Sequence, residues 1–308
     1  MEIALQFGLL VLGFVMLAKG ADWFVEGAAG IAMRFGIPQL VIGLTIVAMG
    51  TSAPEAAVSI AAAVKGNADI TIGNIVGSNI LNILVILGLA ASIVPIAVAR
   101  STVRIEIPFM IGVIALLFYQ GRDGSISLAD GGVLMVAFAA YMMYLYTMAM
   151  KSNVDSDLEE PGLPLGRCLL GAVGGLALII AGSNVTVGAA TSIANYAGLS
   201  ERFIGLTIVA LGTSLPELFT SVAAARRGNA DIAIGNIVGS NIFNILFVVG
   251  LSSLIIDIPF ASAFNFDTYV ALGAAVLLWL CVLRTQRLQR WAGALMLVCY
   301  AAYLGYIL

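Results

Sequence analysis

Apolar residues run along this 308-residue chain in stretches of about twenty, separated by short polar or charged segments. An α-helix needs about 20 apolar residues to cross the hydrocarbon core of a bilayer. By this criterion we predict ten transmembrane helices, and the fold class is an all-α polytopic membrane protein. The expected spans are residues 3–20, 37–64, 69–93, 104–120 and 128–149, followed by 166–184, 202–225, 231–255, 267–283 and 290–307.

The composition agrees with a membrane protein and excludes several kinds of metal and catalytic site. Hydrophobic residues make up 61% of the chain and charged residues 10%, whereas a soluble domain carries about a quarter charged residues. The chain has no histidine, which excludes imidazole metal sites and histidine-based catalytic pairs. Its three cysteines, Cys168, Cys281 and Cys299, lie far apart and show neither metal-ligand spacing nor a disulfide framework.

An internal repeat is the most informative feature of the chain. The 46-residue segment Gly43–Gly88 returns at Gly205–Gly250 with a constant offset of 162, and 33 of the 46 positions are identical. Each copy places one glutamate, Glu55 or Glu217, in an apolar, glycine-rich stretch. A carboxylate in hydrocarbon is costly and usually functional. Two of them, related by a repeat, predict a cation site shared between two halves of a transporter.

The repeat and the span count predict two halves of opposite orientation. We expect a first five-helix repeat at residues 1–150, an acidic connecting loop at 151–164 and a second five-helix repeat at 165–308, which together form one transport domain. Five spans per half is an odd number, so the second half is expected to be inverted. With the N-terminus outside, three of the 14 basic residues fall in outside loops (Lys65, Arg122, Arg202) and the other eleven inside. This bias predicts that both termini lie outside the cell membrane.

Around each glutamate, polar residues share one face of the expected helix. Ala48, Thr51, Ser52 and Glu55 are spaced at i, i+3, i+4 and i+7, and the second copy repeats them as Ala210, Thr213, Ser214 and Glu217. Hydroxyl and carboxylate oxygens are the ligands that hard cations such as Na⁺ and Ca²⁺ prefer.

A proline next to each glutamate predicts a distorted helix. Pro54 and Pro216 clash with the carbonyl groups four residues back, so backbone carbonyls near Ala48 and Ala210 become candidate ligands. The alternative is a proline kink that serves packing, with the hydroxyls bonded back to the helix.

The next span supplies a second polar row. Asn74, Ser78 and Asn82 recur at i, i+4 and i+8, and the repeat gives Asn236, Ser240 and Asn244. We favour Ser78, Asn82, Ser240 and Asn244 as ligands. For Asn74, Asn79, Asn236 and Asn241, packing between membrane helices is an equally good explanation. Outside the repeats, Asp22, Glu26 and Glu106 are expected near the membrane interfaces.

The repeat motifs resemble those of a known family. GTSAPE with GSNILN, and GTSLPE with GSNIFN, resemble the two α repeats of the sodium/calcium exchanger family, in its short prokaryotic form. The resemblance implies a site where the repeats meet at mid-membrane, with Glu55 and Glu217 shared by Ca²⁺ and Na⁺. It implies Thr51 and Thr213 as backbone ligands near Ca²⁺, and Asn82 and Asn244 in the middle of the cluster. The flanking Na⁺ sites would take Ser52, Ser214, Ser78 and Ser240 with the Ala48 and Ala210 carbonyls.

One position departs from part of the family. Some relatives, including potassium-dependent exchangers, carry Asp where this chain has Asn244. Two carboxylates favour a potassium-independent exchanger and leave the stoichiometry open.

The predicted function is therefore Na⁺/Ca²⁺ antiport by alternating access, with the transported ions and the lipid bilayer as partners and no cofactor. A Ca²⁺/H⁺ antiporter is the main alternative, because buried carboxylates can carry protons, but a proton would not need the row of hydroxyls. A cation channel is less favoured because channel filters usually arise from oligomeric symmetry. An intramembrane protease is disfavoured, because the chain lacks histidine and mid-span aspartates, so we expect no enzyme activity.

Overall fold

The computed structural model describes residues 2–66, 68–152, 163–198 and 210–307. Within these residues, eight helices are long and apolar enough to cross a membrane, and one bent pair makes a possible ninth span. The uninterrupted spans are α1 (Glu2–Arg34), α8 (Leu128–Ser152), α9 (Leu165–Tyr196), α15 (Ala263–Leu283) and α16 (Arg290–Ile307). The protein is thus an all-helical, multi-pass membrane protein.

Three of the eight spans contain a π-helical segment, in which the helix is wider than an α-helix, and the bent pair contains another, η1 (Gly43–Val47). The three spans are α5–η2–α6 (Asp69–Leu81, Asn82–Leu87, Gly88–Ile93), η3–α7 (Thr102–Glu106, Ile107–Gln120) and α13–η6–α14 (Ala230–Phe243, Asn244–Val249, Gly250–Ile255). The segments η2 and η6 begin at Asn82 and Asn244, two of the predicted ligands. Single π turns within α-helices are frequent at functional sites.

The bent pair carries the first copy of the glutamate motif. It consists of α2 (Gln39–Ile42), η1 (Gly43–Val47) and α3 (Ala48–Thr51), followed after a 51° bend by α4 (Ala53–Val64). The second copy continues as α11 (Ala210–Thr213) and α12 (Leu215–Arg226). The first eight residues of the expected span 202–225 lie outside the described residues.

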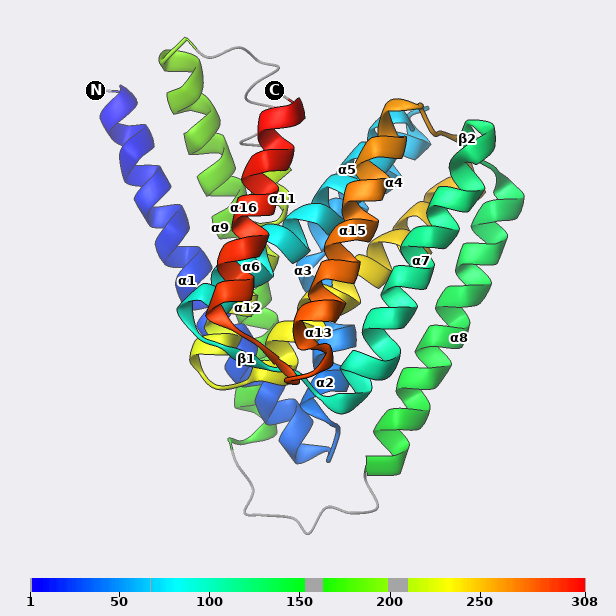
Figure 1. Cartoon of the computed structure of the whole chain (residues 1–308). Coiled ribbons are helices and arrows are strands. Elements are labelled where there is room, and N and C mark those ends of the chain that lie inside the picture. Colours follow the sequence, from blue (N-terminus) through cyan, green and yellow to red (C-terminus); the bar gives the residue numbers. More distant parts are fainter. Residues whose placement is uncertain (1, 67, 153–162, 199–209, 308) are drawn as a thin grey trace.

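Helix α1 precedes the first copy of the sequence repeat and α9 precedes the second, and the two helices pack side by side in opposite directions (Figure 1). Both are longer than the expected spans 3–20 and 166–184, since they have 33 and 32 residues. In α1, Lys19, Asp22 and Glu26 continue the helix, because lysine and glutamate are good helix formers. Gly20 and Gly175 allow close approach, because a Cβ on Gly175 would lie 2.5 Å from the Phe24 nitrogen.

Contacts between distant parts of the chain also occur at the helix ends. Two short antiparallel strand pairs each join an early loop to a late one: β1 (Ile96–Ala97) pairs with β4 (Arg287–Leu288), and β2 (Ser125–Ile126) pairs with β3 (Ile258–Pro259). These pairs lie at opposite ends of the molecule, whereas the beginning of α1 and the end of α16 lie at the same end (Figure 1).

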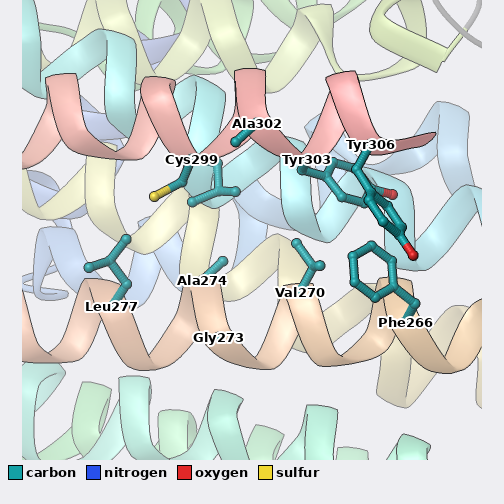
Figure 2. A pocket seen from close by; sticks show the side chains of 10 residues that line it. Phe266, Val270, Gly273, Ala274, Leu277, Cys299, Ala302, Tyr303 and Tyr306 are labelled. Carbon is teal, nitrogen blue, oxygen red and sulfur yellow. The ribbon is translucent and has the colours of Figure 1, made fainter. Parts of the chain in front are cut away.

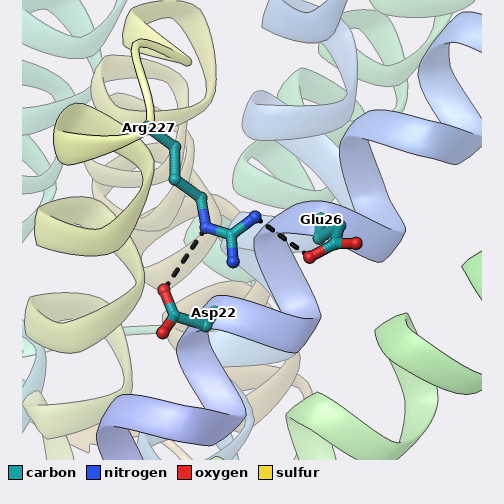
Figure 3. A network of polar contacts seen from close by, with 3 residues as sticks. All are labelled: Asp22, Glu26 and Arg227. Carbon is teal, nitrogen blue, oxygen red and sulfur yellow. Dashed lines mark hydrogen bonds and ion pairs between the residues drawn. The ribbon is translucent and has the colours of Figure 1, made fainter.

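An ion-pair network ties α1 to the end of α12 (Figure 3). The Arg227 guanidinium lies 3.3 Å from an Asp22 oxygen and 3.1 Å from a Glu26 oxygen. All three side chains are more than a third exposed, so each pair contributes about 0–1 kcal/mol to stability.

Candidate ion-binding site

Both glutamates lie in the first turn of a new helix. Helix α3 ends at Thr51, Ser52 leaves helical geometry (φ −81°, ψ 6°), and α4 begins at Ala53 with Pro54 in its first turn. Ser214 (φ −89°, ψ 4°) makes the same break before α12. Proline is tolerated in a first turn, where its missing N–H would have no helical partner. The expected distortion is thus a full break, and it places a carboxylate where the helix dipole favours negative charge.

The two copies exchange hydrogen bonds at their carboxylates. The Ser52 hydroxyl donates to Glu217 Oε1 at 2.8 Å, and the Ser214 hydroxyl donates to Glu55 Oε1 at 3.2 Å. Thr51 lies next to the Glu217 carboxyl group, and Thr213 lies next to that of Glu55. Each carboxylate is therefore positioned by the break in the other repeat.

Four oxygen atoms at this meeting point have no hydrogen-bond partner among the described residues. They are Glu55 Oε2, Glu217 Oε2, Asn82 Oδ1 and Asn244 Oδ1. All four side chains are only 1% exposed. Buried polar atoms are nearly always paired, and an unpaired buried charge is far more costly than an unpaired amide. Such a set of unpaired acceptors is what a cation-binding site requires.

Asparagines of α5 and α13 connect the two helices that carry the second polar row. Asn79 and Asn241 each donate from Nδ2 to the other's backbone carbonyl at 3.2 Å. The Asn82 amide donates to Asn241 Oδ1 at 2.9 Å, and the Asn244 amide donates to Asn79 Oδ1 at 3.3 Å. These bonds use the nitrogen atoms of Asn82 and Asn244, which leaves their Oδ1 atoms free to accept.

A further pair of asparagines supports the glutamate helices. Asn74 donates to the Ser59 hydroxyl at 2.9 Å and to the Glu55 carbonyl at 3.3 Å. Asn236 makes the equivalent bonds to Ser221 at 2.9 Å and to the Glu217 carbonyl at 3.4 Å. These asparagines, like Asn79 and Asn241, make structural contacts of the kind that the packing interpretation predicts.

Two backbone carbonyls around the breaks each accept a hydroxyl group from another helix. The Ala48 carbonyl accepts the Ser52 N–H at 3.0 Å and the Ser240 hydroxyl at 3.4 Å. The Gly212 carbonyl, four residues before Pro216, accepts the Ser183 hydroxyl of α9 at 2.7 Å. Ser78 is buried in α5, and Ala210 begins α11. The structure thus brings the two repeats together around the glutamates.

One buried carboxylate was not singled out by the sequence analysis. Glu106, expected near a membrane interface with Asp22 and Glu26, is only 1% exposed, whereas those two side chains are partly exposed in the Arg227 network. The Tyr144 hydroxyl of α8 donates to Glu106 Oε1. Glu106 lies outside both repeats, so no duplicated motif draws attention to it. It lies close to the start of the span Thr102–Asp123, so its burial, and not its place along the span, is what the sequence analysis did not predict.

Comparison with known proteins identifies the family. The family model for the sodium/calcium exchanger protein matches residues 5–147 and 168–308. The chain is 40% identical over 305 residues to the putative antiporter CaxA of Alkalimonas amylolytica, with 96% of each chain aligned. It is 33% identical over 345 residues to the sodium/calcium exchanger MaX1 of Methanosarcina acetivorans, with 98% of each aligned.

A solved structure gives the same result. The sodium-calcium exchanger NCX_Mj, soaked with 2.5 mM Na⁺ and 10 mM Sr²⁺, matches with a TM-score of 0.86 at 34% identity, over 98% of this chain and 99% of that chain. This chain therefore belongs to the sodium/calcium exchanger family.

Proposed function

We propose that this protein exchanges Na⁺ for Ca²⁺ across the cell membrane, by alternating access to one site built on Glu55 and Glu217. The observation that carries the proposal is the set of four unpaired oxygens from Glu55, Glu217, Asn82 and Asn244. Two carboxylates match the charge of one Ca²⁺, and the same pair can hold several Na⁺ ions with help from neutral oxygens.

The surrounding residues divide into central and flanking ligands. Thr51 and Thr213 join the glutamates and asparagines at the centre. The flanking Na⁺ positions take Ser52, Ser214, Ser78 and Ser240 with the Ala48 and Ala210 carbonyls. Because Ser52 and Ser214 also bond to the carboxylates, Na⁺ and Ca²⁺ share ligands and compete. Strict competition is what couples two opposite fluxes.

The proposed architecture is ten helices in two inverted halves, residues 1–150 and 165–308, joined by the loop 151–164. The constant repeat offset, the opposite directions of α1 and α9, and the reciprocal bonds at the site support it. The distribution of lysine and arginine supports an orientation with both termini outside. Two such halves offer two related conformations, one open to each side.

The experiment that tests this function is Ca²⁺ uptake into proteoliposomes loaded with Na⁺ and diluted into Na⁺-free buffer. We expect uptake that requires internal Na⁺ and is lost in both Glu55→Gln and Glu217→Gln. Asp123→Asn is the matched control, because it makes the same carboxylate-to-amide change on an exposed residue. It should leave uptake unchanged.

Two results would overturn the proposal. Uptake driven by a pH gradient without Na⁺ would identify a Ca²⁺/H⁺ antiporter that uses the same carboxylates. Flux that depends on neither counter-ion gradient would identify a channel.

A further inference from the structure

A second group of buried oxygens lies between η3 and α8, on segments outside both repeats. Its centre is Glu106, whose Oε1 accepts the Tyr144 hydroxyl. Three other atoms of the group have no hydrogen-bond partner within the described part of the chain: Glu106 Oε2, Thr102 Oγ1 and Tyr141 OH. Thr102 is fully buried and Tyr141 is 5% exposed.

These three oxygens belong to one cluster. The Ser101 and Thr102 hydroxyls lie next to the Glu106 carboxyl group, on the same helical turn. Tyr141 interacts electrostatically with both Glu106 and Tyr144. The cluster therefore repeats the signature of the central site, which is a buried carboxylate with an unpaired oxygen among other unpaired oxygens.

Within the described part of the chain, no basic side chain forms an ion pair with Glu106. The two ion pairs found among the described residues both involve Arg227. Arg104, two residues before Glu106, is exposed. A single proton on Glu106 would remove the charge, but it could be donated to only one of the two hydroxyl oxygens. A bound cation can contact the carboxylate and both hydroxyls at once.

The second half contains a related pair that serves as an internal comparison. The Tyr303 hydroxyl of α16 donates to Asp267 Oδ1 of α15 at 2.8 Å, and Tyr300 precedes Tyr303 by three residues, as Tyr141 precedes Tyr144. Asp267 is partly exposed and has no unpaired buried oxygen. Tyr303 faces a cavity of about 470 Å³ between α15 and α16 (Figure 2). Of these two tyrosine–carboxylate pairs in the described chain, only the one in the first half has a fully buried carboxylate with an unpaired oxygen.

We propose that Glu106, Thr102 and Tyr141 form a second cation site, which binds one Na⁺ and is separate from the exchange site. One carboxylate with neutral hydroxyl oxygens matches a hard monovalent ion, whereas a divalent ion would keep an excess positive charge. The ligands come from η3 and from α8, so bound Na⁺ fastens α8 to the helix that begins at Thr102.

The test measures Na⁺-dependent thermal stability of the full-length protein in detergent. The background is the Glu55→Gln/Glu217→Gln double variant, which removes both carboxylates of the exchange site. Na⁺ is titrated against choline at constant ionic strength and pH. Because Na⁺ that binds only the folded state raises its Tm, we expect a saturable rise in this background.

Substitutions in the cluster assign the rise. Glu106→Gln should abolish it, and Thr102→Val, which keeps the side-chain shape, should raise the Na⁺ midpoint roughly tenfold. Asp267→Asn is the matched control and should leave the Na⁺-dependent rise in Tm and the Na⁺ midpoint unchanged. A Na⁺ titration of Glu106→Gln that is identical to the background overturns the proposal. So does a Tm that ignores Na⁺ but depends on pH through Glu106, since that would assign the cluster to a proton. The readout uses no transport, so failure of the proposed exchange function would not affect it.

Discussion

At the residue scale, each glutamate is tied to a serine of the other repeat. A hydrogen bond to a charged group contributes about 1.5–3 kcal/mol. If Ser52 acts through Glu217, then Ser52→Ala and Glu217→Gln should show a coupling energy of that order. Ser52→Ala and Glu55→Gln should be close to additive. The bond lengths of 2.8 and 3.2 Å predict weaker coupling for Ser214 with Glu55.

The measurement is the free energy of unfolding of single and double variants in buffer without Na⁺ or Ca²⁺. If the coupling energy of Ser52 with Glu55 equals its coupling energy with Glu217, the serine–glutamate bonds between the repeats are not what positions the carboxylates.

The sequence indicated which proposed ligands would gather where the repeats meet, because they repeat at helical spacing. Glu55, Ser52 and Asn82, with their counterparts, have the expected spacing and are buried where the repeats meet. Which atoms pair across the two copies could not be predicted, because the contacts join residues about 160 positions apart. The burial of Glu106 was not predicted for a similar reason, since its tyrosine partner lies 38 residues away on another helix.

At the element scale, the close packing of α1 on α9 depends on glycine. A Cβ on Gly175 would lie 2.5 Å from the Phe24 nitrogen and 2.7 Å from the Gly20 oxygen, both backbone atoms. Gly175→Ala should therefore push the helices apart, lower stability by about 1–3 kcal/mol and slow transport. Gly174→Ala is the matched control, because a Cβ there meets nothing within 4 Å.

Thermal unfolding and Ca²⁺ uptake of both variants check this prediction. If Gly175→Ala is as stable and active as Gly174→Ala, the two helices do not need this close approach.

The elements themselves were only partly predictable. Pro54 and Pro216 indicated disturbed helices, and the breaks fall at Ser52 and Ser214, two residues earlier. The π-helical turns that begin at Asn82 and Asn244 were not predicted, because no residue pattern in the sequence distinguished them from ordinary α-helix. Strands of two residues are too short to produce an alternating pattern.

At the scale of the whole molecule, the inverted arrangement predicts that equivalent loops face opposite sides. In a variant without Cys168, Cys281 and Cys299, the substitution Lys65→Cys should react with a membrane-impermeant maleimide in intact cells. Arg226→Cys should react only after permeabilisation. Both side chains are exposed, so access to the reagent depends on the side of the membrane.

Labelling of both positions from the same side would contradict the inverted arrangement. Labelling with the two sides exchanged would keep the inversion and reverse the orientation of the termini.

The crossed serine–glutamate bonds have a consequence for ancestry. Each repeat supplies a donor to its counterpart and accepts the same bond in return, which is the rule of an isologous dimer interface. Consider a protein that consists of one half only and inserts into the membrane in both orientations. Two oppositely oriented copies could associate through this surface and form the same group of buried oxygens. Fusion into one polypeptide releases the halves from identity away from that surface, as the Glu106 cluster, found on the first-half segments alone among the described residues, shows. Fusion also leaves the two glutamates constrained together. A substitution of either carboxylate removes the hydrogen bond that it accepts from the serine of the other half.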